Sequence, residues 1–399
     1  METIELSIEE LNALSAKAGA SYDWHKAYDE NYDSGPFCNL AEDDWKKIDS
    51  FRKELDSKLP KRKFLGYTVN STLGIAAGPL LNHKFVNHYA RLGFDMPVQK
   101  TVRSVATRVH PFPNVLLINV DHQLSENEIG SKTVAKLDAK QENLSITNSF
   151  GMPSKSVEEW REDFKKVKPG EGQLKLISVV GTPPSAKGKA GCSSCISSSH
   201  SEFQHLAEDF GALAQLCFEG GAQAVEMNFS CPNVTGKEGQ IYTNVDSARE
   251  ICKAARAQVG NGKKLIVKLG FYKDYGNLAA VLEAVTDYVD GVTAINTIPL
   301  EIVDEKGVQA MPGEGRLRSG VCGFAIRDLA VRTVSNFAEV RKKLGRDFAI
   351  TGVGGITRPQ DALEFYDAGA DAVQIATGAM WDQLLGLKIK LLLSRGEVV

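Results

Sequence analysis

Short apolar runs alternate with longer amphipathic stretches from Leu73 almost to the end of the chain. Nine runs have the length of a strand and are bounded by polar or glycine-rich residues. They are Leu73–Gly78, Pro97–Val102, Leu144–Ser149, Leu174–Val180, Ala224–Ser230, Leu265–Leu269, Gly291–Asn296, Phe348–Gly352 and Ala372–Thr377. The helical stretches are Val157–Val167, Glu202–Phe218, Val245–Val259, Leu278–Val289, Ile326–Leu344 and Asp361–Ala368. Strands that alternate with helices in this way predict a parallel sheet.

About 330 residues of this alternation fit an α/β fold, a (β/α)8 TIM barrel with inserted loops. A doubly wound open sheet is the alternative, but no Gly-x-Gly-x-x-Gly motif opens the first helix. Nine runs are one too many for eight strands, so we expect Leu144–Ser149 to enter the mouth of the barrel. The polar segment Val105–Gln141 is expected as an insert that can form a hairpin. Thr182–Ser199 is rich in Gly, Ser and Lys and is expected to be a flexible loop.

The first part of the chain has a different pattern, and we expect residues 1–62 to form an N-terminal helical extension before a barrel domain of residues 63–399. Ser7 followed by Glu10 is a helix-starting capping box. A second helix is expected from Leu40 to Leu59, where Pro60 ends it. We assign no chemistry to this extension and expect it to serve as a lid or an oligomer contact.

Composition excludes several classes of protein. The chain has 399 residues, 43% hydrophobic and 24% charged, as in ordinary globular proteins, and its formal net charge is -3. No basic field therefore favours nucleic acid or an acidic membrane as a partner. Seven scattered cysteines favour free thiols in a reducing compartment. The N-terminus does not resemble a signal peptide and no run approaches the ~20 apolar residues of a membrane span, so we expect a cytoplasmic protein.

Two lysines lie inside apolar runs. Lys100 lies between Gln99 and Thr101, and Lys268 follows Val267. In a barrel, functional residues lie where strands end and loops begin. One buried ammonium group is explained equally well by a structural ion pair, but two on separate strands point to an anionic or electron-rich ligand.

Glycine-rich turns follow the last two strands, at Thr351–Ile356 and Ala376–Gly378. Barrels commonly bind a phosphate there with backbone amides and a helix N-terminus. Ser319–Gly323 offers a third glycine-rich contact. Each motif alone is explained by turn geometry, but three in barrel order predict a cofactor that carries phosphate.

Four asparagines and one cysteine complete the set of residues expected at the mouth of the barrel. Amide side chains both donate and accept hydrogen bonds, so four of them suit an uncharged ring of imides and amides such as a pyrimidine. They are Asn148, Asn228, Asn233 and Asn296. Cys231 follows a strand on a loop that Pro232 forces to begin, although most free cysteines are simply buried. The histidines and acidic residues form no cluster with metal-ligand spacing, so no metal is expected. Cys192 and Cys195 form a CxxC motif; a redox dithiol is possible there, but a mobile loop is favoured.

These stretches together resemble the class 1 dihydroorotate dehydrogenases, from about Leu65 to Met380 and in the same order. The stretches that carry the resemblance are Asn228–Val234, Ala76–Pro79, Gln99–Thr101, Asn148–Pro153, Val267–Leu269, Asn296–Thr297 and Gly354–Gly355. The Cys-Pro-Asn stretch and the two lysines are specific, whereas each glycine motif alone is not. The pyrimidine-reducing domain of dihydropyrimidine dehydrogenase is a related second match.

The resemblance implies an FMN-dependent barrel that oxidises dihydroorotate to orotate in pyrimidine biosynthesis. It makes Cys231 the general base and makes Lys100 and Lys268 contacts of the flavin. Relatives of class 2 have serine at the base, so the cysteine favours a soluble enzyme. The substrate would be held by Lys100, Asn148, Gly151, Met152, Asn228, Asn233, Asn296 and Thr297. The FMN would be held by Ala77, Gly78, Lys100, Thr101, Asn228, Lys268, Gly320, Gly323, Gly354, Gly355, Ala376 and Thr377. Residues Pro232–Gln240 would form a mobile loop over the site.

Several features depart from the family pattern. Both inserts and the extension are longer than in compact class 1 enzymes, and Ala376 stands where a glycine is expected beside the phosphate. The electron acceptor therefore stays open, with fumarate favoured, and a homodimer is expected. Two alternatives also stay open: a related pyrimidine reductase or NAD-linked enzyme that needs a partner subunit, and a flavin-binding scaffold without activity. An enzyme acting on RNA is disfavoured because the chain lacks the excess of basic residues that RNA binding needs.

Overall fold

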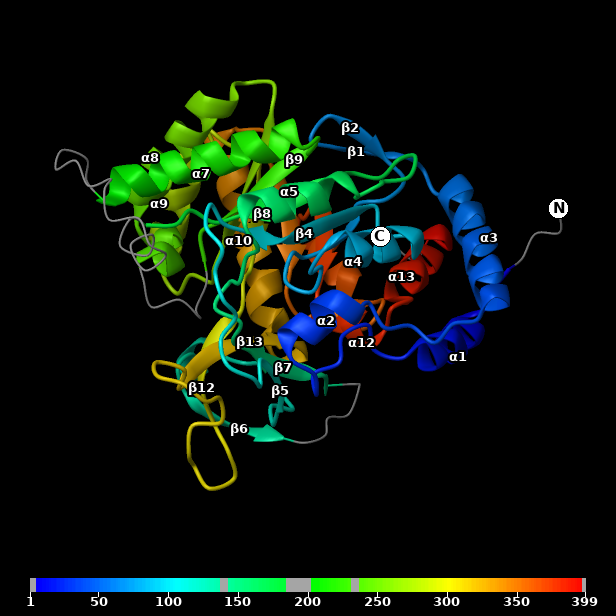
Figure 1. Cartoon of the computed structure of the whole chain (residues 1–399). Coiled ribbons are helices and arrows are strands. Elements are labelled where there is room, and N and C mark those ends of the chain that lie inside the picture. The colour runs from blue at the N-terminus through cyan, green and yellow to red at the C-terminus, as the bar shows by residue number, and fades with distance from the viewer. Residues whose placement is uncertain (1–4, 137–142, 184–201, 231–236, 397–399) are drawn as a thin grey trace.

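The computed structural model describes residues 5–136, 143–183, 202–230 and 237–396, and at its centre lies a closed barrel of eight parallel strands (Figure 1). The strands are β3 (Leu73–Ile75), β4 (Met96–Val102), β8 (Leu176–Val179), β9 (Ala224–Asn228), β10 (Lys264–Leu269), β11 (Gly291–Ala294), β14 (Ala349–Val353) and β15 (Ala372–Ile375). Their order around the barrel is their order in the chain, and β15 closes the ring by pairing with β3. The predicted (β/α)8 barrel is therefore confirmed.

Helices follow the strands, as the right-handed crossover of parallel strands requires. They are α4 (His83–Arg91), α5 (Val157–Lys165), α7 (Glu202–Glu219), α8 (Val245–Val259), α9 (Tyr275–Val285), α10 (Arg327–Leu344), α11 (Asp361–Asp367), α12 (Thr377–Trp381) and α13 (Leu385–Ser394). The amphipathic pattern predicted α8 with the bounds that the structure has. It missed α4, α12 and α13.

The interior of the barrel has an apolar lower layer and a polar upper layer. Side chains two residues apart on a strand point to the same face. Ala224, Ile266 and Ala372 belong to a buried apolar cluster with Phe64 and Val69, which come from the hairpin of β1 (Arg62–Phe64) and β2 (Tyr67–Val69). Two residues further along the same strands come the buried polar residues Glu226, Lys268 and Gln374. The polar layer thus lies nearer the carboxyl ends of the strands, where barrels carry their chemistry.

A second, smaller barrel of five strands forms the lower lobe in Figure 1. It contains β5 (Val115–Ile118), β6 (Lys132–Lys136), β7 (Ser145–Asn148), β12 (Ile298–Val303) and β13 (Arg318–Gly323). Strands β5 and β6 pair in antiparallel fashion, which confirms the expected hairpin. Strand β7 pairs with β5 and β13 instead of with the main barrel, so the ninth apolar run was correctly excluded from the wall. The sequence did not indicate β12 and β13.

The N-terminal helices are α1 (Ile8–Ala18), α2 (Tyr28–Ser34) and α3 (Glu42–Lys58), and α3 lies beside the C-terminal helix α13 (Figure 1). Ser7 and Glu10 form the predicted capping box of α1. The fully buried Lys390 Nζ lies 2.6 Å from Asp56 Oδ1 of α3 and 2.8 Å from Asp95 Oδ2. Trp24 stacks on Trp381 at a ring-centroid distance of 5.1 Å. The extension is therefore packed firmly on the barrel.

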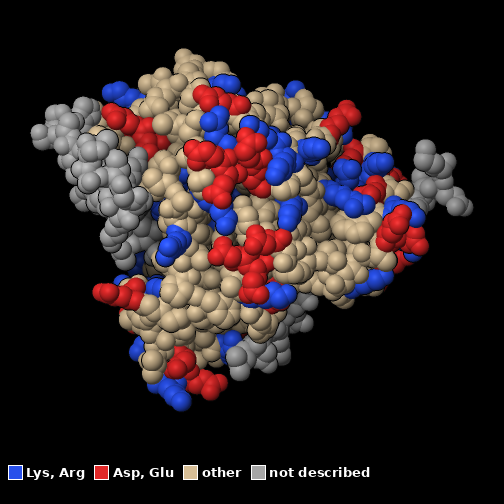
Figure 2. Space-filling view, viewed as in Figure 1, with Lys and Arg blue, Asp and Glu red and all other residues tan. Residues whose placement is uncertain are grey.

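Acidic and basic side chains are interspersed over the face that Figure 2 shows, in keeping with the small net charge of -3. Within the described part of the chain, no helix is both long enough and apolar enough to cross a membrane.

Candidate active site

A large cavity opens at the carboxyl ends of the barrel strands, and residues from the ends of most of these strands line it. Its empty volume is about 1250 Å3 when the open mouth is included, more than the roughly 300–1,000 Å3 of a typical small-molecule site. Sixteen of the residues predicted for the site line it: Ala77, Gly78, Lys100, Thr101, Asn148, Gly151, Met152, Asn228, Lys268, Asn296, Thr297, Gly323, Gly354, Gly355, Ala376 and Thr377. The structure therefore brings together residues up to 300 positions apart, from Ala77 to Thr377.

Three other predicted residues are not among these sixteen. Gly320 pairs with Asn148 across β13 and β7, and its carbonyl oxygen accepts a hydrogen bond from Thr147 Oγ1. Cys231 and Asn233 lie outside the described residues, as do most of the loop expected to cover the site and the CxxC motif. The strand that leads to Cys231 is well placed, because Asn228 at its end lines the cavity.

The two lysines approach the cavity from separate strands and are both more than nine-tenths buried, at 8% exposure for Lys100 and 7% for Lys268. The ammonium group of Lys100 lies 5.3 Å from the ring centre of Phe150 and 5.8 Å from that of Tyr28. Lys268 pairs in register with Asn228 on one side and with Thr293 on the other. Two buried cations that face one cavity favour an anionic or electron-rich ligand.

Amide side chains form a network at the ends of β9 and β11. Asn228 Oδ1 accepts hydrogen bonds from Asn296 Nδ2 at 3.2 Å and from the Ser230 amide at 3.1 Å. Asn296 Nδ2 also donates to the Ser230 carbonyl, and Asn296 Oδ1 accepts from the Thr297 amide at 2.9 Å. These bonds fix the orientation of both amides. They also hold Ser230, the residue that directly precedes Cys231.

The segment after β7 lines the cavity and has an unusual backbone conformation. Gly151 has φ +75°, and a Cβ atom there would lie 2.3 Å from His110 Nε2. Met152 also has a positive φ of 50°, and its carbonyl oxygen accepts a hydrogen bond from Arg103 Nε at 3.2 Å. Residues with a Cβ atom rarely adopt this backbone region, so surrounding contacts must hold it. This conformation places backbone groups of this segment at the cavity wall.

The glycine-rich turn after β14 provides a second backbone wall. Gly355 has φ +87°, and a Cβ atom there would lie 2.4 to 2.7 Å from the Cβ, Cα and backbone nitrogen of Arg327. Only glycine fits this position without a shift of the backbone.

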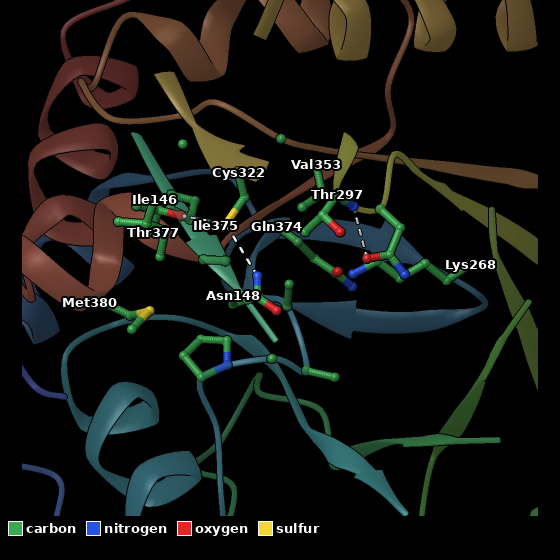
Figure 3. Close-up of a pocket in the computed structure, with 18 of the residues that line it drawn as sticks. Ile146, Asn148, Lys268, Thr297, Cys322, Val353, Gln374, Ile375, Thr377 and Met380 are labelled. Carbon is green, nitrogen blue, oxygen red and sulfur yellow. Dashed lines mark hydrogen bonds between the residues drawn. The ribbon is translucent and has the colours of Figure 1, made fainter. Parts of the chain in front are cut away.

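Cys322 lies at the same end of the cavity as Thr377 (Figure 3). Its sulfur accepts hydrogen bonds from Thr377 Oγ1 at 3.4 Å and from Asn148 Nδ2 at 3.6 Å. Burial raises the pKa of this thiol, against the smaller opposing effects of the two hydrogen bonds and of Lys268. Cys322 is therefore neutral at physiological pH and acts as a small hydrogen-bond acceptor in the wall.

The sequence prediction missed three polar residues of the cavity. Tyr22 reaches it from the N-terminal extension, which was expected to carry no chemistry. Glu226 and Gln374 come from the polar layer inside the barrel. A charged residue within the apolar run Ala224–Met227 was a signal that could have identified Glu226. No sequence signal indicated Tyr22, because its position depends on how the extension packs.

Comparison with known proteins agrees with this geometry. A sequence model of the family described as dihydroorotate dehydrogenase matches residues 61–390. The dihydroorotate dehydrogenase of Dictyostelium discoideum is 34% identical over 378 residues, which cover 92% of this chain and 95% of that protein. The chain belongs to the dihydroorotate dehydrogenase family. It is therefore an oxidoreductase that acts on a CH–CH group of a small molecule, in a family of flavoproteins.

More distant members of the dihydroorotate dehydrogenase family match less of the chain. The catalytic subunit of a dihydroorotate dehydrogenase B (NAD(+)) from Methanocaldococcus jannaschii is 28% identical over 235 residues, covering 59% of this chain and 66% of that subunit. Among solved structures, dihydroorotate dehydrogenase from Eimeria tenella in complex with ferulenol superposes with a TM-score of 0.61 and 16% identity, over 90% of this chain and 93% of that one. At this identity the likeness shows the shared fold alone.

Proposed function

We propose that the protein oxidises dihydroorotate to orotate with FMN as cofactor and Cys231 as general base. The observation that carries this proposal is the composition of the cavity wall. Two buried lysines, a network of asparagine amides and glycine-rich turns line one cavity at the carboxyl ends of the barrel strands. These groups match an electron-rich ring system, a cyclic imide and a phosphate, respectively.

The residues present fit FMN. The backbone at Gly354 and Gly355 has no Cβ atoms, so a phosphate can approach the amides closely. Lys268 and Lys100 supply positive charge beside the rings, and Thr101 and the backbone of Ala77 and Gly78 complete that wall. FMN bound there supplies the hydride acceptor of the reaction.

The other steps are carried by the side chains of the chain itself. Asn148, Asn228 and Asn296, with Thr297 and with Asn233 from the loop beyond the described residues, hold the amide and imide edges of dihydroorotate. Lys100 and the backbone of Gly151 and Met152 hold its carboxylate. The substrate loses a hydride from C6 and a proton from C5, and the C5–C6 bond becomes a double bond. The thiolate of Cys231 takes the proton.

The role of Cys231 predicts a pH dependence. A thiol has a pKa near 8.5 unless its surroundings change it, and only the thiolate can accept the C5 proton. Activity should therefore rise with pH until the thiolate is fully formed. Cys231→Ala should slow reduction of the flavin by roughly 10²–10⁴, the usual contribution of a general base. An unchanged rate in this variant would remove Cys231 from the role.

The experiment that tests the function is anaerobic mixing of the purified yellow protein with dihydroorotate in a stopped-flow spectrometer. We expect the flavin absorbance to bleach, whereas dihydrouracil should leave it unchanged. A spectrum that stays constant at saturating dihydroorotate contradicts the proposal. Subsequent mixing with fumarate tests the acceptor that we favour, and recovery of the oxidised spectrum is the expected result. Light scattering of the holoenzyme tests the proposed homodimer, and limited proteolysis near residue 62 tests the proposed division into extension and barrel.

A partner-dependent enzyme is the second candidate, and the match to a catalytic subunit of an NAD(+)-linked relative favours it. In that case the protein alone would be reduced by dihydroorotate but not reoxidised by fumarate. NADH-linked or NADPH-linked activity, on dihydroorotate or on another dihydropyrimidine, would then require a second subunit. The oxidant tested after anaerobic reduction therefore distinguishes the two candidates.

A further inference from the structure

Glu226 is a buried carboxylate on the cavity wall, and neither the lysine nor the asparagine chemistry described above uses it. Its side chain lies on β9 and is 2% exposed. Glu226 Oε2 accepts one hydrogen bond, from Gln374 Nε2 on β15 at 3.4 Å. Glu226 Oε1 has no hydrogen-bond partner within the described part of the chain, and Gln374 Oε1 has none either. Unsatisfied buried oxygens are rare and call for an explanation.

Glu226 is also the one acidic residue among the described residues that line the cavity, where Lys100 and Lys268 are the basic ones. Lys268 pairs in register with Asn228, two residues beyond Glu226 on the same strand. The side chains of Glu226 and Lys268 therefore both face the barrel interior, from neighbouring strands. The described wall of the cavity thus carries more positive than negative charge.

Charges in a buried site interact strongly because little water screens them. The two lysines favour any state of a bound ligand that carries more negative charge. Glu226 opposes them from the wall of the same cavity. Reduction adds negative charge to a flavin ring, so the balance among these three groups sets how readily the cofactor accepts electrons.

We propose that Glu226 is the counter-charge that limits how strongly Lys100 and Lys268 favour the reduced cofactor. This inference rests on the proposed binding of FMN and deepens it. Gln374 fixes one oxygen of the carboxylate within the polar layer of the barrel, and this layer forms the floor of the cavity. Glu226 therefore tunes the electron affinity of the site without taking part in proton transfer.

The test is the reduction potential of FMN in the purified holoenzyme, measured by equilibration with a reference dye during slow anaerobic reduction. Glu226→Gln keeps the shape of the side chain and its contact with Gln374 but removes the charge. We expect the equilibrium constant for reduction to increase about tenfold, which is about +30 mV for a two-electron couple. Glu226→Leu, a second neutral variant, should shift the potential in the same direction. Glu226→Asp retains the charge and should stay closer to wild type.

Glu301→Gln is the matched control. Glu301 lies on β12 in a partly exposed pair with Arg318 and does not line the cavity, so its loss should leave the potential unchanged. A potential that falls or does not move in both neutral variants overturns the inference, as does a shift in Glu226→Asp as large as theirs. If wild-type protein binds no FMN, the proposed function fails instead. The two failures are thus distinguishable by the flavin spectrum of the wild type.

Discussion

Gly355→Ala is expected to damage the cofactor site by moving the backbone. Gly355 lies in the turn after β14 and has φ +87°. The added methyl group would lie 2.4 Å from Arg327 Cβ, 2.5 Å from its Cα and 2.7 Å from its backbone nitrogen. These atoms begin α10 and cannot rotate away as a flexible side chain could.

Two effects determine the magnitude. A residue with a Cβ atom in the left-handed region costs about 1–2 kcal/mol. Inserting a methyl group into a tightly packed position costs about 1–3 kcal/mol more. We therefore expect the free energy of unfolding to fall by about 2–5 kcal/mol. Because the displaced turn also lines the cavity, the affinity for FMN should fall at least about tenfold, or about 1.4 kcal/mol.

The assay combines urea unfolding of the apoprotein with titration of the apoprotein by FMN, followed by flavin fluorescence. Gly345→Ala is the control, because Gly345 ends the same helix with φ +60° and a methyl group added there would have no other atom within 4 Å. Gly345→Ala should lower the free energy of unfolding only by the cost of the left-handed backbone conformation, about 1–2 kcal/mol, and should bind FMN normally. If Gly355→Ala binds FMN as tightly as wild type, the assignment of this turn to the cofactor is refuted.

Three further predictions concern the extension and its contacts. Lys390→Met should lower the free energy of unfolding by about 3–5 kcal/mol, because it leaves the carboxylates of Asp56 and Asp95 buried without their shared cation; urea unfolding measures this. Burial lowers the pKa of His88 to about 4, below its ordinary value near 6.5. The contribution of neutral His88 to the free energy of unfolding is therefore fully present above pH 6.5 and is lost as the pH falls toward 4. The loss should be about 2 kcal/mol between pH 7.5 and pH 5 and should be absent in His88→Gln, by urea unfolding at both pH values. Tyr22→Phe should not lower the stability of the apoprotein by more than about 1 kcal/mol, because the Tyr22 hydroxyl is buried without a partner among the described residues.

Each of these predictions has a control in the chain. Lys343→Met removes an exposed pair with Glu339 and should change stability little; a loss equal to that of Lys390→Met would contradict the buried-pair argument. A pH dependence that persists in His88→Gln would assign it to other groups. Tyr89→Phe removes a hydroxyl that lies 2.6 Å from Ser21 Oγ and donates to the Ala379 carbonyl, so it should cost about 1–3 kcal/mol. A similar loss in Tyr22→Phe would reveal a partner for that hydroxyl.

The fold could be predicted because each barrel strand is a local signal. A strand buried on both faces is a short apolar run whatever its neighbours are, and all eight wall strands overlap runs that the sequence identified. Strands β12 and β13 were missed because Pro299 and Glu301 interrupt one, and Gly320 and Gly323 made the other resemble a phosphate loop. They pair with each other, and their other partners, β6 and β7, lie more than 160 residues away. No local pattern records such a partner.

The sequence by itself determined the barrel, the lysines inside its strands and the residues at the strand ends. A strand pattern, and a charged residue inside an apolar run, can be recognised from neighbouring residues alone. Only the tertiary structure decided that Tyr22 joins the cavity from the N-terminal extension and that Glu226 meets Gln374 across the barrel. These contacts join segments that are distant in the chain, and they arise from the closure of the barrel and the packing of helices on it. Long-range packing, unlike strand formation, leaves no periodic trace in the residues that take part.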